Sequence, residues 1–238
     1  MKRLHLATLV LTLLASTMMV QAQTAEEIIA KHLESIGGKE KLSSITSLKM
    51  ETNATIMGNE AAGYTLVLNG KGFKNETNFN GSAIVQAFTD KGGWAVSPMG
   101  GDAQAMPDEV YKSGKDAIYI FPFLDYAARG CTVTLAGREK VGDVNAFKVT
   151  LTNADKVSTN YFFDPTSFYI IQTIKTADFM GQPTDLITTF SDFKKTDYGF
   201  VAAHLMDMSF GGGFSFTTKI TKVEVNPAVD ASVFEMKK

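Results

Sequence analysis

Apolar and polar residues alternate with a period of two over most of this 238-residue chain, which is the pattern of half-buried β-strands. The clearest example runs from Leu48 to Ile56, where apolar and polar residues take alternate positions. Asn80-Gly81 lies between two such runs and is typical of a two-residue hairpin turn. Connections this short cannot make the crossovers that parallel strands need. The pattern therefore predicts an antiparallel meander.

Roughly eleven strands are expected in this meander, enough for the sheet to curl around a core. One amphipathic helix precedes them over residues 24–36, with Thr24 and Glu27 forming a capping box. A short second helix is expected over residues 39–45. The alternation breaks between residues 97 and 130, where Pro107 begins a short helix. The fold class is therefore mainly β (α+β). The expected strands span residues 48–56, 64–69, 72–79, 83–88, 94–96, 131–135, 146–152, 158–163, 169–177, 186–192, 204–210 and 214–225.

The first 22 residues resemble an export signal. Lys2 and Arg3 precede an apolar run over residues 6–20, which is too short for a membrane-spanning helix. Val20-Gln21-Ala22 fits a cleavage site, and the next residue, Gln23, is not the cysteine that a lipoprotein would need. We therefore expect a signal peptide over residues 1–22, and a single exported domain over residues 23–238 without a membrane anchor.

Composition argues against several classes of function. The formal net charge is −2, which disfavours nucleic acid and lasting attachment to an anionic bilayer. Cys131 is the only cysteine and is expected to be a buried strand residue, while His32 and His204 lack neighbouring metal ligands. Gly211-Gly212-Gly213 fits a hairpin turn, because neither a nucleophile elbow nor a phosphate-binding loop is present. We therefore expect no cofactor, no metal site and no enzymatic activity.

Soft apolar side chains are abundant, with 11 Met and 17 Phe. Methionine suits surfaces that receive partners of varying shape, although most such residues in any protein simply fill the core. One N-terminal helix cannot cover the whole concave face of a sheet this long. Either the segment over residues 99–128 fills the remaining space, or an apolar cavity is left for a ligand.

Several short segments together resemble the bacterial outer-membrane lipoprotein-sorting family, the LolA-like periplasmic lipoprotein carriers. Their order and spacing cover nearly all of the expected domain. These segments are Ala25-Glu26-Glu27-Ile28-Ile29, Ile84-Val85-Gln86-Ala87-Phe88 followed by Gly93-Trp94, Phe123-Leu124-Asp125-Tyr126, Tyr161-Phe162-Phe163-Asp164-Pro165-Thr166, Phe190-Ser191-Asp192-Phe193 and Val225-Asn226-Pro227.

The resemblance implies an unclosed antiparallel β-barrel wrapped over an N-terminal helix and a short helical lid. It also implies a periplasmic protein that binds without catalysis and shelters a lipid or the acyl group of a lipoprotein. The alternative is an envelope interaction or stress-sensing module that transfers no lipid, with another envelope protein as its partner. A filled interior and an exposed apolar patch would favour this alternative.

Candidate ligand-binding residues are apolar members of the strands and of the expected lid. The strand candidates are taken to share one face, although a register shift of one residue would reverse the assignment for any strand. The strand candidates are Met50, Ile56, Leu66, Leu68, Phe79, Phe88 and Trp94, and the lid candidates are Ile118, Phe121 and Phe123.

Overall fold

The computed structural model describes residues 23–97, 100–179, 182–210 and 213–237. The expected signal peptide over residues 1–22 lies outside the described residues, as do Gly211 and Gly212 of the expected hairpin turn.

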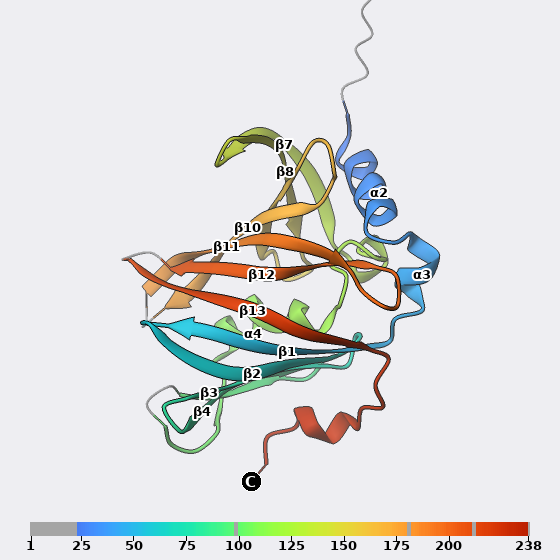
Figure 1. Cartoon of the computed structure of the whole chain (residues 1–238). Helices are drawn as coiled ribbons and strands as arrows, with labels where there is room; N and C mark the ends of the chain where they lie inside the picture. Colours follow the sequence, from blue (N-terminus) through green and yellow to red (C-terminus); the bar gives the residue numbers. More distant parts are fainter. Residues whose placement is uncertain (1–22, 98–99, 180–181, 211–212, 238) are drawn as a thin grey trace, which may run out of the picture.

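Thirteen strands form one antiparallel sheet in the order β6-β5-β4-β3-β2-β1-β13-β12-β11-β10-β9-β8-β7. The predicted meander is confirmed, and the sheet does not close into a barrel (Figure 1). The strand count exceeds the roughly eleven expected: each of the twelve spans given above overlaps a strand, and the additional strand, β6, has only two residues and no readable alternation. The strands are β1 Ser47–Ile56, β2 Asn59–Leu68, β3 Gly72–Phe79, β4 Ser82–Thr89, β5 Gly93–Val96, β6 Gln104–Ala105, β7 Thr132–Val141, β8 Val144–Thr152, β9 Ser158–Phe163, β10 Ile170–Phe179, β11 Gln182–Lys195, β12 Val201–Phe210 and β13 Phe214–Val225.

The sheet consists of two meanders, β1 to β6 and β7 to β13, which are joined where β1 pairs with β13. Strands β6 and β7 are therefore the two edges, and the chain between them must pass from one edge to the other. This connection contains α4 (Asp108–Gly114) and the short 3-10 helices η1 (Lys115–Ile118) and η2 (Ala127–Arg129). We call residues 107–130 the helical segment. It lies inside the curve of the sheet, where Figure 1 shows α4 behind the strands.

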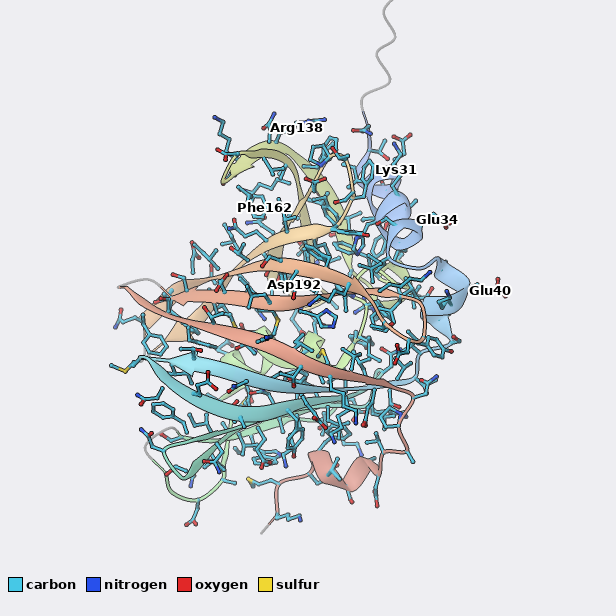
Figure 2. The ribbon with its side chains drawn as sticks, in the orientation of Figure 1. Lys31, Glu34, Glu40, Arg138, Phe162 and Asp192 are labelled. Atoms are coloured by element: carbon cyan, nitrogen blue, oxygen red, sulfur yellow. The ribbon has the colours of Figure 1, made fainter. Side chains whose placement is uncertain are left out.

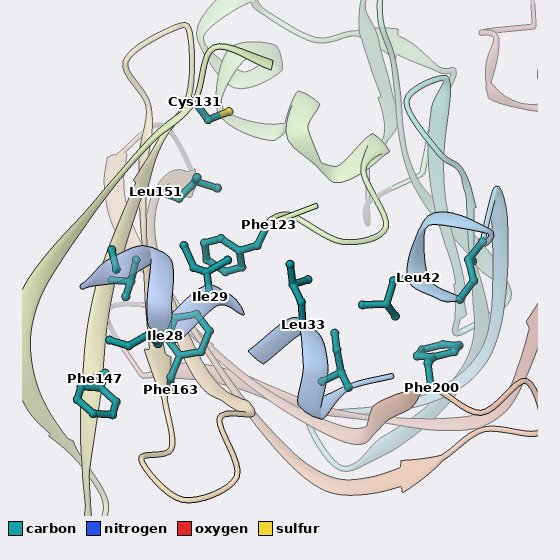
Figure 3. Close-up of a cluster of buried hydrophobic side chains, with 14 of the residues drawn as sticks. Ile28, Ile29, Leu33, Leu42, Phe123, Cys131, Phe147, Leu151, Phe163 and Phe200 are labelled. Carbon is teal, nitrogen blue, oxygen red and sulfur yellow. The ribbon is translucent and has the colours of Figure 1, made fainter. Parts of the chain in front are cut away.

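Helix α2 (Ala25–Ser35) begins at the predicted capping box, in which Thr24 and Glu27 each bond to the other's backbone N–H. Its apolar side, including Ile28, Ile29 and Leu33, packs into the buried hydrophobic core cluster. Figure 3 shows Phe123 of the helical segment pointing toward Ile29 from the other side of this cluster. The predicted second helix is α3 (Lys39–Ser43). Figure 2 shows the charged residues of both helices, Lys31, Glu34 and Glu40, at the outer side.

The strand register identifies the concave face of the sheet. Met50 packs against the cluster around α2, and its direct partners across β13 and β2 are Val223 and Thr65. Directly paired residues of antiparallel strands lie on the same face, and the face changes at each successive residue. Every other assignment of a side chain to the concave or convex face follows from these pairs.

On the convex face of the sheet, the C-terminal 3-10 helix η3 (Ala231–Phe234) packs against β3 and β4. Phe234 is 1% exposed and lies directly over Gly72, where an added Cβ would be only 2.3 Å from its ring. The indole Nε1 of Trp94 donates a hydrogen bond of 2.7 Å to the carbonyl oxygen of Phe234. Only glycine at position 72 leaves room for this aromatic ring, so the C-terminal turn is seated in a fitted site.

Candidate functional site

A cavity of about 260 Å³ lies between the concave face of β8 to β11 and the helical segment. We call it the larger cavity, because a smaller enclosed hollow adjoins it. Its apolar wall includes Leu151 of β8, Tyr161 of β9 and Leu186 of β11. Its other wall is formed by residues 113–129. The full lining is Ser113, Gly114, Asp116, Ala117, Tyr119, Pro122, Arg129, Leu151, Asn153, Val157, Thr159, Tyr161, Thr173, Lys175, Leu186 and Thr188.

A smaller hollow of about 150 Å³ shares Asp116, Tyr119, Arg129 and Asn153 with the first, so these residues lie between the two spaces. The helical segment thus fills part of the concave side and leaves space beside η1. Both alternatives raised by the sequence hold in part: the segment packs against the sheet, and a cavity remains.

Apolar side chains continue from the cavity along the concave face. Leu186 lines the cavity and pairs with Phe210, which pairs in turn with Phe214. Phe216 follows on the same face, between Met208 of β12 and Ile56 of β1. These side chains are half-buried, and the three phenylalanine rings lie 5.9 to 6.3 Å apart. We call these residues, Ile56, Leu186, Met208, Phe210, Phe214 and Phe216, the Phe–Met strip.

The charged side chains of the cavity are Asp116, Arg129 and Lys175. Asn153 Nδ2 donates a hydrogen bond of 2.6 Å to the Asp116 carboxylate. The Lys175 ammonium donates to the carbonyl oxygen of Ser113, and burial lowers the pKa of Lys175 despite the nearby Asp116 charge. Burial likewise raises the pKa of the Tyr161 hydroxyl, so this group is neutral at physiological pH.

Arg129 is held at the cavity wall by contacts within the helical segment. Its guanidinium stacks 4.0 Å above the Tyr119 ring and donates to the carbonyl oxygen of Pro122. Its Nε is buried and has no hydrogen-bond partner among the described residues. Burying a charged group's N–H donor without a partner costs folding free energy, so the Arg129 Nε–H is available to donate a hydrogen bond to an acceptor of a ligand.

A third hollow is an open groove of about 530 Å³ between α2 and residues 123–128. Ile29, Leu33 and Phe123 contribute apolar surface to it. Charged residues also line it, and Lys39 and Asp125 among them form an exposed ion pair of 3.4 Å. The remaining lining residues are Glu26, Ala30, Glu34, Tyr126, Ala127 and Ala128.

The seven strand candidates do not share one face, so that part of the prediction was wrong. Met50, Ile56, Phe79 and Phe88 lie on the concave face. Leu66, Leu68 and Trp94 lie on the convex face, because they pair with Lys49, Ser47 and Ala87 respectively. Apolar residues occupy both faces of β2, with Val67 on the concave face and Leu66 and Leu68 on the convex face, so alternation alone could not separate the two faces.

The concave candidates differ in their surroundings. Phe88 is buried under the helical segment, where an added Cβ on Gly114 would lie 2.1 Å from its ring. Only Ile56 belongs to the Phe–Met strip. Among the lid candidates, Ile118 lines the smaller hollow and Phe123 lines the open groove, whereas Phe121 packs edge-on against Phe200 at 5.8 Å. None of the ten candidates lines the larger cavity.

Sequence reasoning missed the residues that do line this cavity, above all Lys175, Arg129 and Tyr161. Lys175 stands between Ile174 and Thr176. The apolar residue here, Ile174, lies on the convex face, so the alternation of the strand points to the wrong face as the buried one. Polar residues on a concave face resemble solvent-facing residues in a single sequence. Lys175 pairs directly with Leu186, which places its side chain on the concave face. This pairing is visible only in the structure, so no signal for Lys175 could be read from the sequence alone.

Histidine and cysteine have structural roles here. Cys131 is buried, and its burial raises the pKa of the thiol, which disfavours the reactive thiolate. No cluster of three or more potential metal ligands is found among residues 23–97, 100–179, 182–210 and 213–237. Within those same ranges no helix has the length and apolar character needed to cross a membrane.

His32 should make the stability of the fold depend on pH. The ring is buried between Phe123 and Phe163, and burial lowers its pKa from 6.5 to about 4, although the Phe168 carbonyl, 2.9 Å from Nδ1, opposes the shift. Below pH 6.5 the His32 imidazole is protonated in the unfolded chain, whereas in the folded protein it stays neutral down to about pH 4. The free energy of unfolding should therefore fall as pH falls through this window, by about 3 kcal/mol in total.

Urea unfolding at a series of pH values measures this effect. The variant His32→Leu keeps an apolar side chain of similar size and should lose this part of the pH dependence, while the contribution of the carboxylates remains. Parallel pH profiles for the two proteins would show that His32 does not titrate in this way.

Comparison with known proteins identifies the fold. No protein-family model and no curated protein sequence matches the chain. Among solved structures, a domain from Vibrio parahaemolyticus described as an outer membrane lipoprotein-sorting protein matches with a TM-score of 0.57 and 14% identity, over 87% of this chain and 94% of that one. A LolA superfamily protein from Nitrosomonas europaea matches with a TM-score of 0.58 and 11% identity, over 90% of this chain and 98% of that one. The chain therefore has a LolA-like fold, and at these identities the likeness concerns the fold alone.

Proposed function

We propose, from the LolA-like fold and the cavity within it, that this protein is a non-catalytic binding protein that shelters a lipid or the acyl group of a lipoprotein. The observation that carries the proposal is the cavity of about 260 Å³ whose wall continues, at Leu186, into the half-buried Phe–Met strip. This arrangement offers an elongated apolar surface on the inside of the sheet. The proposal places the protein in the periplasm, after removal of residues 1–22, with a lipid or acylated lipoprotein as its partner.

The size of the cavity suits a single acyl chain. A methylene group is close in size to a water molecule, which takes about 30 Å³ of liquid, so about eight methylene groups fit in the cavity. Burial of each contributes about 0.8 kcal/mol, or about 6 kcal/mol before the costs of association. A longer chain would extend over the Phe–Met strip, where flexible Met208 can adapt to its shape.

Filling the cavity should weaken the binding of a neutral probe with an alkyl chain. We expect Thr173→Phe, which enlarges a lining residue, to lower the affinity for decanol by about tenfold, because expelling two methylene groups from the cavity costs about 1.6 kcal/mol. Thr176→Phe on the same strand is the matched control, since Thr176 is exposed and alternates to the convex face. Isothermal titration calorimetry measures both affinities.

Equal affinities of the wild type and both variants would place decanol outside the cavity and contradict the proposed site. Absence of binding of decanol and of every charged amphiphile with the same chain length by the wild type would contradict the proposed function itself. Native mass spectrometry of protein purified from its own host adds a check, since a carrier should retain a lipid under gentle conditions.

A second candidate function, an envelope interaction module, is favoured by the open groove between α2 and residues 123–128. Its more exposed apolar lining, Ala30, Tyr126 and Ala127, stands beside the acidic side chains of Glu26 and Glu34, a combination that suits a peptide with small apolar and basic residues. Cross-linking in cells would separate the two functions, because a carrier should be linked to several lipoproteins and an interaction module to one partner.

A further inference from the structure

Three charged side chains line the larger cavity, and their charges do not cancel. Arg129 and Lys175 are cations, and Asp116 is the only carboxylate in the lining. No ion pair joins Asp116 to either cation among the described residues, and its carboxylate is bonded by the neutral Asn153 amide. Lys115 lines the smaller hollow, where Asp155 neutralises it. The larger cavity therefore has an excess of one positive charge.

Both cations have unused capacity to donate hydrogen bonds. The Lys175 ammonium has three donors, and the Ser113 carbonyl is its acceptor among the described residues. The Arg129 guanidinium stacks on Tyr119 and bonds to Pro122, while its Nε stays buried without a partner. Burial of these donors is costly unless an acceptor, best of all an anion, completes them.

The surroundings of the two cations are amphipathic. Ser113, Asp116 and Asn153 are polar neighbours on the cavity wall, whereas Leu151, Val157 and Leu186 are apolar and Leu186 leads to the Phe–Met strip. A molecule that fits this wall has a charged end and an apolar tail. A neutral lipid would leave the positive charge uncompensated.

We propose that the ligand of this cavity is an acyl amphiphile with an anionic head, and that Lys175 and Arg129 bind this head while its chain lies along Leu151 and Leu186. The inference rests on the proposed function and specifies the class of ligand. The shared chemistry is a negatively charged oxygen group, which a fatty-acid carboxylate or a lipid phosphate can supply. The lowered pKa of Lys175 agrees with this role, because an anion beside the ammonium would offset its burial.

The test compares decanoate, decyl phosphate and decanol, which share a chain length and differ in the head. In calorimetric titrations we expect the wild type to bind at least one of the two anions about tenfold more tightly than decanol. The anion with the larger advantage identifies the source of the head. The variant Lys175→Met, which keeps the apolar stem and removes the charge, should lose most of this advantage and bind decanol as before. Lys175→Gln serves the same purpose if the methionine variant does not fold.

Lys140→Met is the matched control, because it removes the same charge from an exposed position on β7 and should leave all three affinities unchanged. Equal binding of decanol and both anions by the wild type would overturn the anionic head and leave the proposed carrier function in place. An anion preference that survives at Lys175→Met and Lys175→Gln would equally overturn the assignment. Failure of all three compounds to bind would overturn both proposals.

Discussion

The variant Phe123→Ala should lose about 3–5 kcal/mol of folding free energy, the usual cost of removing a buried phenylalanine side chain. Phe123 is 2% exposed and holds the helical segment to the rest of the core. Its ring packs edge-on against Tyr161 at 4.7 Å and lies 5.5 Å from Phe163 and 6.1 Å from His32. No other residue of the segment contacts both α2 and β9 through aromatic rings among the described residues. Urea unfolding followed by circular dichroism measures the loss.

The conservative variant Phe123→Leu refines this prediction. Leucine keeps most of the apolar volume and should recover more than half of the lost stability. If Phe123→Ala instead unfolded at the wild-type urea concentration, the segment would not depend on this anchor. Because the segment forms one wall of the cavity, the alanine variant should also bind decanol more weakly than the wild type under conditions where it remains folded.

Removal of the Phe234 ring should cost a similar amount, about 3–5 kcal/mol in Phe234→Ala. The ring fills the space above Gly72 on the convex face, and its backbone carbonyl accepts the hydrogen bond from Trp94. A hole in this position exposes Ala87 and Val85, which are otherwise buried on the same side of β4. Thermal and urea unfolding, together with the fluorescence of Trp94, the only tryptophan, would report the loss.

The neighbouring residue provides the control for this variant. Val233 is 37% exposed, so Val233→Ala should change the free energy of unfolding by less than about 0.5 kcal/mol. Equal effects of the two substitutions would mean that the C-terminal turn detaches in solution. Native Trp94 emission in Phe234→Ala would point to the same conclusion.

Local patterns in the sequence predicted the elements of the fold well. The capping box at Thr24, the hairpin at Asn80-Gly81 and the helix that begins after Pro107 are all present, because each depends on residues close together in the chain. The short strand β6 escaped prediction because two residues carry no periodic signal. Short-range rules therefore describe this chain accurately wherever an element is long enough to show a period.

The candidate site was harder to predict, because it depends on contacts between distant residues. Leu66 and Trp94 looked like lining residues, yet both lie on the convex face, where the C-terminal turn, far away in the sequence, accepts the hydrogen bond of Trp94. Nothing in the sequence singled out Lys175, because a lysine in an alternating strand resembles a solvent-facing residue, yet the helical segment encloses it. The face of a strand that becomes the inside is decided by what covers it, and alternation within the strand cannot supply that information.

The pairing of β1 with β13 has a consequence for the order in which the chain can fold. Within each meander the strands pair with their neighbours in sequence, and such local contacts form quickly. The pairing of Leu48 with Val225 joins residues from opposite ends of the chain and must wait for the last strand. Until then a chain that emerges N-terminus first leaves one edge of β1 unpaired, open to a strand of another molecule. The final strand thus closes the centre of the sheet, and a chain truncated before β13 should aggregate rather than form a smaller version of the fold.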